Sequence, residues 1–407
     1  SRAANGVVLV TTKRGDNKRL SVTYSSNFSN SQPINLLQYV SDYPTHMRLM
    51  NESARNIGTA EVFSANTIAA WEAAQKDPNG LNPNGVPNRI AFPNTNWNDE
   101  MYNNSLVMDH NLSLNGGGQN ARYLLSVGYL DNPGLVEATG FQRFTLRTNV
   151  EVNATKWLTV GTRTYATLSD TELGNYGSML QYIRESTPGL VGRYNGKYGF
   201  PEAPEESATA NNVYVFLLGS NGDNKSLWLN TTLFSKVQFA KGLSWDLNFN
   251  YVKRFDEYQS RSNPAVGERV KFSTGTIVSP PTAPSLLSTY YDTYSSYNYT
   301  LENLLKYETV IADRHTFNAL AGYNELYFFG FNHNANKRGL FDESAYTFNS
   351  ATEMLSIGGS ATDWALRSWF GRLNYSFDDR YLLEANIRYD GSSRFHPDSR
   401  FGWFPSF

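Results

Sequence analysis

The feature that most constrains this chain is a series of two-faced strands joined alternately by short and by long connections. The first of these strands places Leu20, Val22, Tyr24 and Phe28 on one side and serine, threonine and asparagine on the other. A period of two puts successive side chains on opposite faces of a strand. One face of such a strand is therefore apolar, and the other is polar.

The same alternation predicts twelve strands. They lie near 19–30, 107–116, 121–131, 141–153, 157–168, 226–239, 243–255, 294–308, 314–330, 364–377 and 381–390, and the twelfth begins near 400. Tight turns are expected at 116–120, 154–156, 240–242, 309–313 and 378–380, and the other connections cover 31–106, 132–140, 169–225, 256–293, 331–363 and 391–399. Short and long connections alternate without exception, as they do at the two ends of a transmembrane β-barrel.

The odd–even split predicts which side chains would meet lipid in such a barrel. On the lipid side we expect Leu20, Val22, Tyr24, Phe28, Phe144, Leu146, Val150, Val152, Leu243, Trp245, Leu247, Phe249 and Tyr251. On the lumen or plug side we expect Arg143, Arg147, Asn149, Glu151, Asp246, Asn248 and Asn250. An arginine at mid-membrane on the lipid side costs about 2–4 kcal/mol, so the two sides are not interchangeable.

The composition is compatible with a barrel. The chain has 407 residues, 40% of them hydrophobic, and no apolar run is long enough for a membrane helix. Barrel strands escape such a scan because half of each strand faces a polar lumen. Aromatic residues make up 14% of the chain, which fits girdles at the membrane interfaces, although ordinary sheet cores favour the same residues. A net charge of −2 argues against a nucleic-acid partner.

The sequence lacks the patterns of enzyme chemistry. Cysteine is absent, which excludes disulfides, thiolate metal sites and a cysteine nucleophile. The histidines are scattered without metal-ligand spacing, at His46, His110, His315, His333 and His396. Neither G-x-S-x-G nor G-x-G-x-x-G occurs, and the glycines at 116–118 lie between two alternating runs, where they predict a hairpin turn. We therefore predict no enzyme, no metal site and no cofactor.

Three blocks of sequence carry a more specific signal. They are SRAANGVVLVTTKRG at 1–15, YLDNPGLVEATGFQRFTLRTN at 129–149, and WFGRLNYSFDDRYLL at 369–383 with RYDGSSRF at 388–395 and FPS at 404–406. In this order they resemble the end of the plug domain, an early barrel hairpin and the mid-barrel block of TonB-dependent outer-membrane transporters of the SusC/RagA type. Together the blocks span nearly the whole chain, whereas the longest loops match little.

The resemblance marks two sets of family-motif residues. The first is Arg2, Asn5, Gly6, Lys13 and Gly15, around a β-branched run that is typical of a buried strand. The second is Asp390, Gly391, Ser392, Ser393, Arg394 and Phe395. Asp390 and Gly391 favour a turn after the strand, and we expect Arg394 to pair with Asp390 across it. This turn chemistry favours a structural loop latch over a ligand contact.

The resemblance implies an all-β fold, namely part of a transmembrane antiparallel β-barrel (roughly half of a barrel of 22 strands) preceded by the last strand of a plug. Residues 1–15 would be the C-terminal end of the plug domain. Residues 16–407 would be the first half of the barrel, with long extracellular loops at about 31–106, 169–225, 256–293 and 331–363. Because the chain begins at Ser1 within a strand-like run, we expect it to be a piece of a longer protein of the bacterial outer membrane.

The resemblance also implies a function and partners. Members of this family import nutrients, usually oligosaccharides and sometimes peptides, and the TonB–ExbB–ExbD complex drives import through a segment upstream of the plug. A SusD-like surface lipoprotein would close the barrel mouth, and outer-membrane lipid would surround the wall. The implied source is a Bacteroidota-type bacterium. Two alternatives remain: an outer-membrane signalling or binding receptor of the same architecture, and a passive porin, against which the strand-like run at 1–15 argues.

The first long loop predicts two helices. Ser41 and Asp42 can cap the first helix, which has Pro44 in its first turn. One face of this helix then carries Tyr43, Met47, Met50 and Ala54. The second helix is expected from Ser64 to Lys76. Amphipathic faces of this kind favour packing, here on the barrel rim, over contact with a lipoprotein or substrate.

Two tryptophans of the same loop are candidate contacts. Trp71 lies on the second helix and Trp97 near the end of the loop, and either could contact substrate or the lipoprotein lid. Tryptophan also anchors barrels at the membrane interface, and that role is favoured for any single one.

Overall fold

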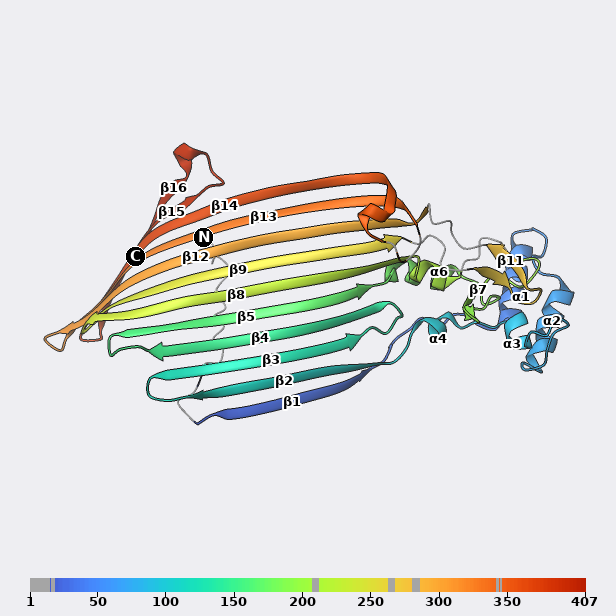
Figure 1. Cartoon of the computed structure of the whole chain (residues 1–407), viewed down its shortest axis with the longest axis horizontal. Coiled ribbons are helices and arrows are strands. Elements are labelled where there is room, and N and C mark those ends of the chain that lie inside the picture. Colours follow the sequence, from blue (N-terminus) through green and yellow to red (C-terminus); the bar gives the residue numbers. More distant parts are fainter. Residues whose placement is uncertain are drawn as a thin grey trace.

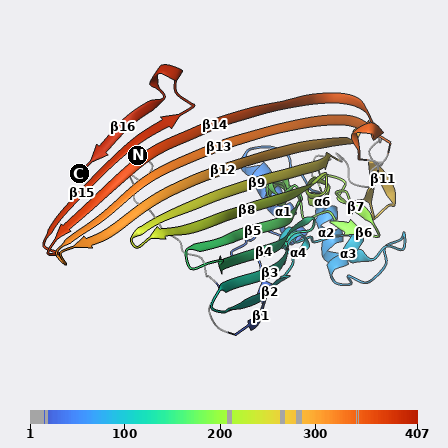
Figure 2. The ribbon, with the colours of Figure 1, turned by 60° about the vertical axis from the view of Figure 1, so that its left-hand side comes forward.

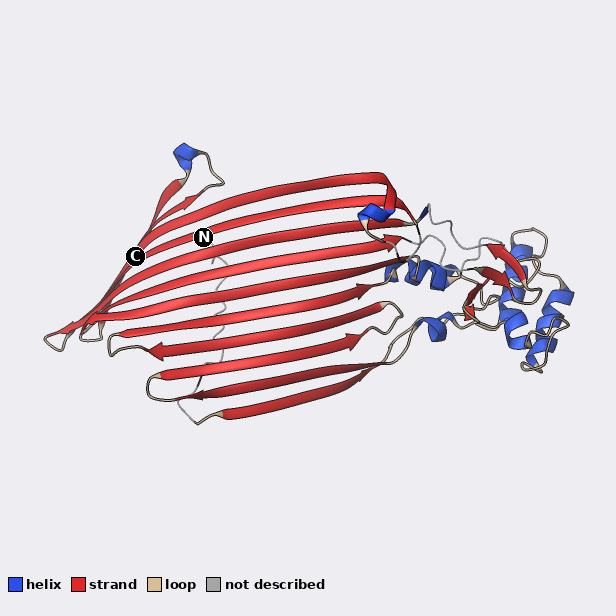
Figure 3. Ribbon diagram, in the orientation of Figure 1, coloured by secondary structure: helices blue, strands red, loops and turns tan. Residues whose placement is uncertain are grey.

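The computed structural model of the chain describes residue 15 and residues 19–206, 212–262, 268–279, 286–341, 344 and 346–407. The expected plug strand lies outside these residues, and with it Arg2, Asn5, Gly6 and Lys13. The described chain consists of one large antiparallel sheet and a lobe of helices and loops at one end of it (Figures 1 and 3).

The large sheet confirms all twelve predicted strands and their order. They are β1 (Ser21–Ser31), β2 (Ser105–Gly117), β3 (Ala121–Pro133), β4 (Thr139–Asn153), β5 (Leu158–Leu173), β8 (Ser220–Ala240), β9 (Leu243–Ser262), β12 (Ser288–Ile311), β13 (His315–Leu340), β14 (Ala351–Phe377), β15 (Tyr381–Ser392) and β16 (Phe401–Ser406). Each strand is antiparallel to the next one in this series. The sheet forms a curved wall with β1 and β16 at its edges (Figure 2).

Several strands continue farther than the sequence pattern predicts. β13 runs to Leu340 and β14 starts at Ala351, so the connection expected at 331–363 shrinks to 341–350. Backbone pairing between the two strands continues to Leu340 and Ala351. The first half of β14 is nevertheless exposed on both faces. A strand segment that buries neither face needs no apolar–polar alternation, so the sequence pattern fades there although the strand does not.

The tight turns all lie at one end of the sheet, called here the turn end. The other connections lie at the opposite, lobe end, except that between β15 and β16, which lies part-way along β14, level with Leu366 (Figure 1). The turns span 118–120, 154–157, 241–242, 312–314 and 378–380. Gly242 has φ +80°, and a β-carbon there would clash with the carbonyl oxygen of Glu308, so only glycine fits this turn. Two adjacent turns are joined by Arg314, which donates to both carboxylate oxygens of Asp378 at 2.9 and 2.6 Å.

The two faces of the sheet differ in chemistry, as the odd–even split predicts. On one face, called here the apolar face, Leu146 lies beside Val127, and Phe249 lies beside Leu301. On the other, called the polar face, Arg147 lies beside Ser126. Large side chains such as Leu146, Val127 and Phe249 are well exposed. An exposed apolar surface of this extent fits a lipid surrounding.

Two aromatic rows bound the apolar face. The row nearer the lobe end contains Tyr251, Tyr297, Tyr299, Tyr327 and Phe329, whose neighbouring ring centroids lie 5.7–6.2 Å apart. The row nearer the turn end contains Phe317 and Tyr375, with centroids 4.8 Å apart. The separation of Phe317 and Tyr327 on β13 corresponds to about 33 Å along a strand and, at a tilt of about 40°, to a height of about 25 Å. This is the height of the apolar band of outer-membrane barrels.

The Glu325–Arg367 ion pair lies on the apolar face, next to the lobe-side aromatic row. The Glu325 carboxylate accepts hydrogen bonds from Arg367 at 2.8 Å, from Tyr323 at 2.6 Å and from Tyr299 at 3.1 Å. The charge is thus neutralised and fully bonded where an aromatic row meets water. It therefore marks the upper limit of the apolar band and does not interrupt it.

The lobe is built from the connections at the lobe end. The β1–β2 connection contributes α1 (Tyr43–Asn56), α2 (Ala65–Gln75), α3 (Asn88–Ala91) and α4 (Trp97–Met101). The β5–β8 connection contributes α5 (Tyr176–Glu185), β6 (Arg193–Tyr194), β7 (Lys197–Gly199) and α6 (Val213–Leu217), and the β9–β12 connection contributes β10 (Arg269–Lys271) and β11 (Thr276–Ser279). The sequence did not predict these short strands, which form a second, four-stranded sheet, because so few residues show no period. Within the described ranges no helix combines the length and the apolar character needed to cross a membrane.

Both predicted helices form, and the first is capped where the sequence placed its cap. Asp42 caps α1 by accepting a hydrogen bond from the Thr45 N–H at 3.0 Å, and Ser64 caps α2 by accepting one from the Thr67 N–H at 3.2 Å. The expected packing on the barrel rim is wrong. The two helices pack against each other, and their side chains form a core with Phe63 and other loop residues beyond the strand ends (Figure 1).

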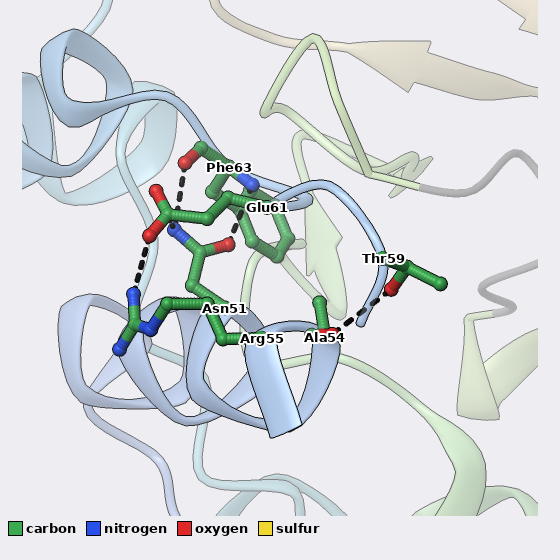
Figure 4. Close-up of polar contacts among 6 residues, drawn as sticks. All are labelled: Asn51, Ala54, Arg55, Thr59, Glu61 and Phe63. Carbon is green, nitrogen blue, oxygen red and sulfur yellow. Dashed lines mark hydrogen bonds and ion pairs between the residues drawn. The ribbon is translucent and has the colours of Figure 1, made fainter. Parts of the chain in front are cut away.

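The predicted buried face of α1 is wrong at one position: Met50 is exposed, and the neighbouring Asn51 is buried instead. The Asn51 amide accepts a hydrogen bond from the Phe63 N–H at 2.8 Å and donates one to the Phe63 carbonyl at 2.7 Å (Figure 4). Thr59 donates to the carbonyl of Ala54 at 3.1 Å in the same turn. A buried amide therefore fixes the segment that follows the helix, and an apolar residue could not replace it.

Glu202 and Ser273 together link all three long connections of the lobe. The buried carboxylate of Glu202 accepts hydrogen bonds from the backbone N–H groups of Phe272 at 2.5 Å and Ser273 at 3.1 Å. The Ser273 carbonyl accepts hydrogen bonds from the amides of Asn82 and Asn84 at 2.9 and 2.6 Å. Burial raises the pKa of the Glu202 carboxyl above its usual range, against the lowering effect of its hydrogen bonds. The lobe is therefore one packed unit and not three separate loops.

Glu202→Ala should loosen the β9–β12 connection. The change leaves the Phe272 and Ser273 N–H groups buried without acceptors, at a cost of about 1–3 kcal/mol each. We expect amide exchange in residues 268–279 to accelerate about ten- to hundredfold, measured by hydrogen–deuterium exchange on the complete receptor. Glu268→Ala is the matched control, because it removes only a partly exposed ion pair with Lys197 from the same segment. Equal acceleration in both variants would contradict the role of Glu202.

Leu247→Arg should impair assembly in the membrane far more than Asn248→Arg. Leu247 lies on the apolar face, beside Asn303, and an arginine in the middle of that band costs about 2–4 kcal/mol. Asn248 lies on the polar face and donates to Glu302 at 3.0 Å. The measurement is the amount of folded receptor in the outer-membrane fraction. Comparable amounts for the two variants would overturn the assignment of the faces.

Candidate functional site

Gly15 lies against the polar face of the sheet. A β-carbon on Gly15 would clash with the backbone of Tyr123 in β3. Gly15 also borders a small hollow on the polar face, together with Asn149 and Glu151. These two side chains were expected to meet the lumen or plug. Gly15 is the one member of the first family-motif set that the structure describes.

The cations around this hollow have partners. Arg122 forms an ion pair with Glu151 on the neighbouring strand. The guanidinium carbon of Arg163 lies 4.4 Å from the ring centroid of Phe234, in cation–π geometry. This part of the polar face is thus internally compensated.

A groove of about 250 Å³ opens on the polar face, closer to the lobe end. Residues of β2 to β5 line it, among them Asp109, Asn111, Arg143, Arg147 and Tyr165. Asp109 accepts a hydrogen bond from the Asn111 amide at 2.8 Å, and the guanidinium carbon of Arg147 lies 5.2 Å from the ring centroid of Tyr165. The Nε of Arg143 is buried and has no hydrogen-bond partner among the described residues. The groove therefore holds two arginines and one acid.

Trp228 lies next to this groove. It is on the polar face, beside Thr167 and Arg254 of the flanking strands, and its side chain is 46% exposed. Its ring meets that of Tyr165 edge to face, with centroids 6.1 Å apart and planes at 88°. Such a contact leaves a large part of the indole face free.

A second hollow, of about 230 Å³, lies in the lobe between α1, α4 and α5. His46, Asn96, Trp97 and Arg184 are among its lining residues. Burial lowers the pKa of His46, although the carboxylate of Glu206 acts in the opposite direction. His46 is therefore neutral at neutral pH, and Arg184 supplies the positive charge of this hollow.

The two tryptophans named as candidate contacts are enclosed in the lobe. Trp71 is 3% exposed, and its indole N–H donates to the carbonyl of Pro93 at 3.1 Å. Trp97 is 5% exposed and donates to the carbonyl of Thr187 at 3.0 Å. Both lie in packed clusters of the lobe, and Trp97 only borders the second hollow. Neither offers an open ring face to a sugar, and neither lies in an aromatic row of the sheet.

The second family-motif set forms a loop that is pinned to β14. The Ser393 N–H donates to the carbonyl of Ala365 at 2.9 Å, and the Ser393 hydroxyl accepts from the Ala365 N–H at 2.8 Å. The Ser392 N–H donates to the carbonyl of Arg400 at 3.0 Å. These bonds hold the loop backbone, which agrees with the interpretation as a structural latch.

The expected Asp390–Arg394 pair is wrong. Asp390 pairs with Arg388 at 2.9 Å, and the guanidinium carbon of Arg394 lies 4.6 Å from the ring centroid of Trp364. Asp390 and Gly391 belong to β15, which continues to Ser392, so the turn begins later than predicted. Two residues that are two apart in a strand share a face, and this brings Arg388 to Asp390.

The sequence pattern predicted the placement of some of these site residues and missed others. The predicted lumen-side residues Arg143, Arg147, Asn149 and Glu151 do lie on one wall segment. Trp228 was missed, although an aromatic residue at a polar-face position, between Leu227 and Leu229, breaks the alternation and could have been noticed. Within the described residues no group of three or more His, Asp or Glu side chains could hold a metal ion.

The fold and sequence of the chain are similar to those of known outer-membrane receptors. It is 27% identical to the TonB-dependent receptor SusC of Bacteroides thetaiotaomicron, over all of this chain and 38% of SusC. It is 26% identical to the TonB-dependent receptor P39 of Formosa agariphila, over all of this chain and 36% of that receptor. The chain thus spans little more than a third of the length of these curated relatives. No family model matches the chain.

The solved structures agree on the fold. The RagAB peptide importer in its open-open state superimposes on 99% of this chain and 45% of the matched chain, with a TM-score of 0.73 at 20% sequence identity. The curved wall, its apolar band and the sequence relatives together confirm the barrel fold and the outer-membrane location. In sequence and fold the chain is therefore similar to the SusC/RagA type of TonB-dependent outer-membrane receptors, over part of their length.

Proposed function

We propose that the complete protein imports a nutrient across the bacterial outer membrane in a TonB-dependent manner. The observation that carries this proposal is the asymmetry of the sheet: an apolar outer face, a polar inner face, and the long connections packed into one lobe at one end. A wall of this kind encloses a polar passage and places a recognition surface at its entrance.

The first candidate for the nutrient is an oligosaccharide, and the second is a peptide. One relative is SusC, and one structural neighbour is named a peptide importer, so the names alone do not decide between the two classes. The polar face favours the first class, because neutral hydrogen-bonding side chains such as Asn230, Asn250 and Thr232 bond to one another there. Side chains of this kind suit sugar hydroxyls.

The partners in this proposal are a SusD-like surface lipoprotein and the TonB–ExbB–ExbD complex. The lobe supports the first partner, since it is a single folded surface at the end where the long connections gather. The TonB complex would act on a segment N-terminal to residues 1–15, and these residues would be the end of the plug domain. Residues 16–407 would form the first half of the barrel, with the lobe outside the cell.

Deletion of the gene should abolish energy-dependent uptake. We expect at least a tenfold loss in the uptake of one labelled oligosaccharide from a panel that also contains peptides, at low external concentration. A protonophore should reduce uptake in the parent strain to the same level, because TonB couples import to the proton gradient. Normal uptake in the deletion strain, with loss of a transcriptional response to the sugar, would favour the alternative of a signalling receptor.

An epitope tag should show which end of the sheet faces outward. The turn at Asn195 and Gly196 is the exposed tip of the β6–β7 hairpin in the lobe, and Asp379 lies in the β14–β15 turn at the opposite end. In the complete receptor we expect a tag at 195–196 to be labelled on intact cells and a tag at Asp379 to be labelled only after permeabilisation. Labelling of Asp379 on intact cells would reverse the proposed topology.

A further inference from the structure

We propose that the groove at Arg143 and Arg147, together with the ring face of Trp228, is a subsite for an acidic sugar residue, a uronate, within an imported oligosaccharide. This inference rests on the proposed import function and narrows its substrate class. It joins two observations: uncompensated positive charge in a concave site, and a half-exposed tryptophan at its border.

The charge argument starts from the partners of the polar-face arginines. Arg122 and Arg388 have carboxylate partners in ion pairs, with Glu151 and Asp390. Among the residues that the structure describes, neither Arg143 nor Arg147 is within ion-pair distance of a carboxylate. Guanidinium groups that line a concave surface without a counter-ion favour a planar anion, and a carboxylate can take two parallel hydrogen bonds from one of them.

The one acid of the groove does not cancel this charge. Asp109 lies in the same row as Arg143, two strands away, and its carboxylate is held by the Asn111 amide at 2.8 Å. Two cations and one anion leave a net charge of about +1 in the groove. The buried Nε of Arg143 still needs an acceptor, and a ligand carboxylate can supply it.

Trp228 provides the second element of the subsite. Its 46% exposure contrasts with the 3% of Trp71 and the 5% of Trp97, which are packed in the lobe. The face of an indole ring is electron-rich, and the C–H groups on one side of a sugar ring can stack on it. Tyr165 lines the groove and contacts Trp228, so that one ligand can reach both parts.

The size of the groove limits what it can hold. Its volume of about 250 Å³ lies below the about 300–1,000 Å³ of a typical small-molecule pocket. It would therefore take one sugar residue, and the rest of the oligosaccharide would extend over Trp228. The groove also lies nearer the lobe end than the hollow at Gly15, and Gly15 does not line it.

The test uses the complete receptor purified in detergent, with calorimetric titration of tetrasaccharides of galacturonate and mannuronate. A neutral tetrasaccharide and an acidic tetrapeptide are the comparison ligands. We expect at least one uronate to bind tenfold more tightly than the neutral sugar. Arg143→Gln combined with Arg147→Gln should weaken uronate binding about ten- to hundredfold and leave any neutral-sugar binding unchanged. Trp228→Ala should weaken uronate binding about tenfold.

Two matched variants separate the site from general effects. Arg372→Gln removes an arginine of the same face six strands away, and Trp369→Ala removes a tryptophan of similar exposure, 42%, on the apolar face. Neither should change uronate affinity. Four outcomes would each overturn the inference. They are equal binding of neutral and acidic sugars, no binding of either uronate, a preference for the acidic peptide, and equal losses of affinity in the control variants. Uptake by cells is measured separately, so import without uronate selectivity would refute this subsite and leave the proposed function standing.

Discussion

The pairing of backbone N–H and C=O groups is the constraint on which the rest of this structure depends. In a lipid surrounding each unpaired group costs several kcal/mol, so the spanning segments must form a continuous ladder. The chain satisfies this requirement with neighbouring hairpins, in which each strand pairs with the strand before it and the strand after it. Strands in chain order force successive connections to opposite ends. Tight turns collect at one end, and everything that needs length, from α1 to β11, collects at the other.

The alternation of side chains along each strand then gives the two faces of the sheet different tasks. One face meets lipid and is apolar between the aromatic rows. A charged side chain on this face needs a bonded partner, and Glu325 has one in Arg367. The other face is free to carry function, and most of its charges are paired or stacked. Arg163 lies over Phe234, and Arg388 pairs with Asp390. Arg143 and Arg147 line a concave part of this face without a carboxylate partner among the described residues, although Arg147 also stacks on Tyr165.

The sequence predicted the fold where a repeated local pattern carried the information and failed where the information was long-range. Period two located all twelve strands, cap chemistry located the start of α1, and the range expected for the second helix matches α2 within one residue at each end. The upper part of β14 was missed because it is exposed on both faces and shows no period. Asn51 and Glu202 were missed because their roles depend on partners 12 and 70 residues away, which no spacing rule connects.

The candidate site shows the same division. Strand parity placed Arg143 and Arg147 on the inner face, since facing depends only on alternation. Parity could not show that they share a groove, because that depends on the register between β3, β4 and β5. The pairing of Asp390 with Arg394 was wrong for a related reason. The turn was placed one to two residues too early, and in a strand such a shift exchanges one partner for another.

The uneven lengths of β14 and β15 locate the boundary between membrane and water. β15 ends at Ser392, opposite Leu366, so β14 from Ala351 to Ala365 has a strand neighbour only on the β13 side within the described residues. Unpaired backbone groups along such an edge are tolerable in water and not in lipid. The apolar band must therefore end near Leu366. Two independent features lie at the same level: Tyr327 of the aromatic row is paired with Ala365, and the Glu325–Arg367 ion pair occupies the adjacent position on that face. Backbone pairing, aromatic anchoring and charge placement thus define one plane, and the lobe stands wholly on its aqueous side.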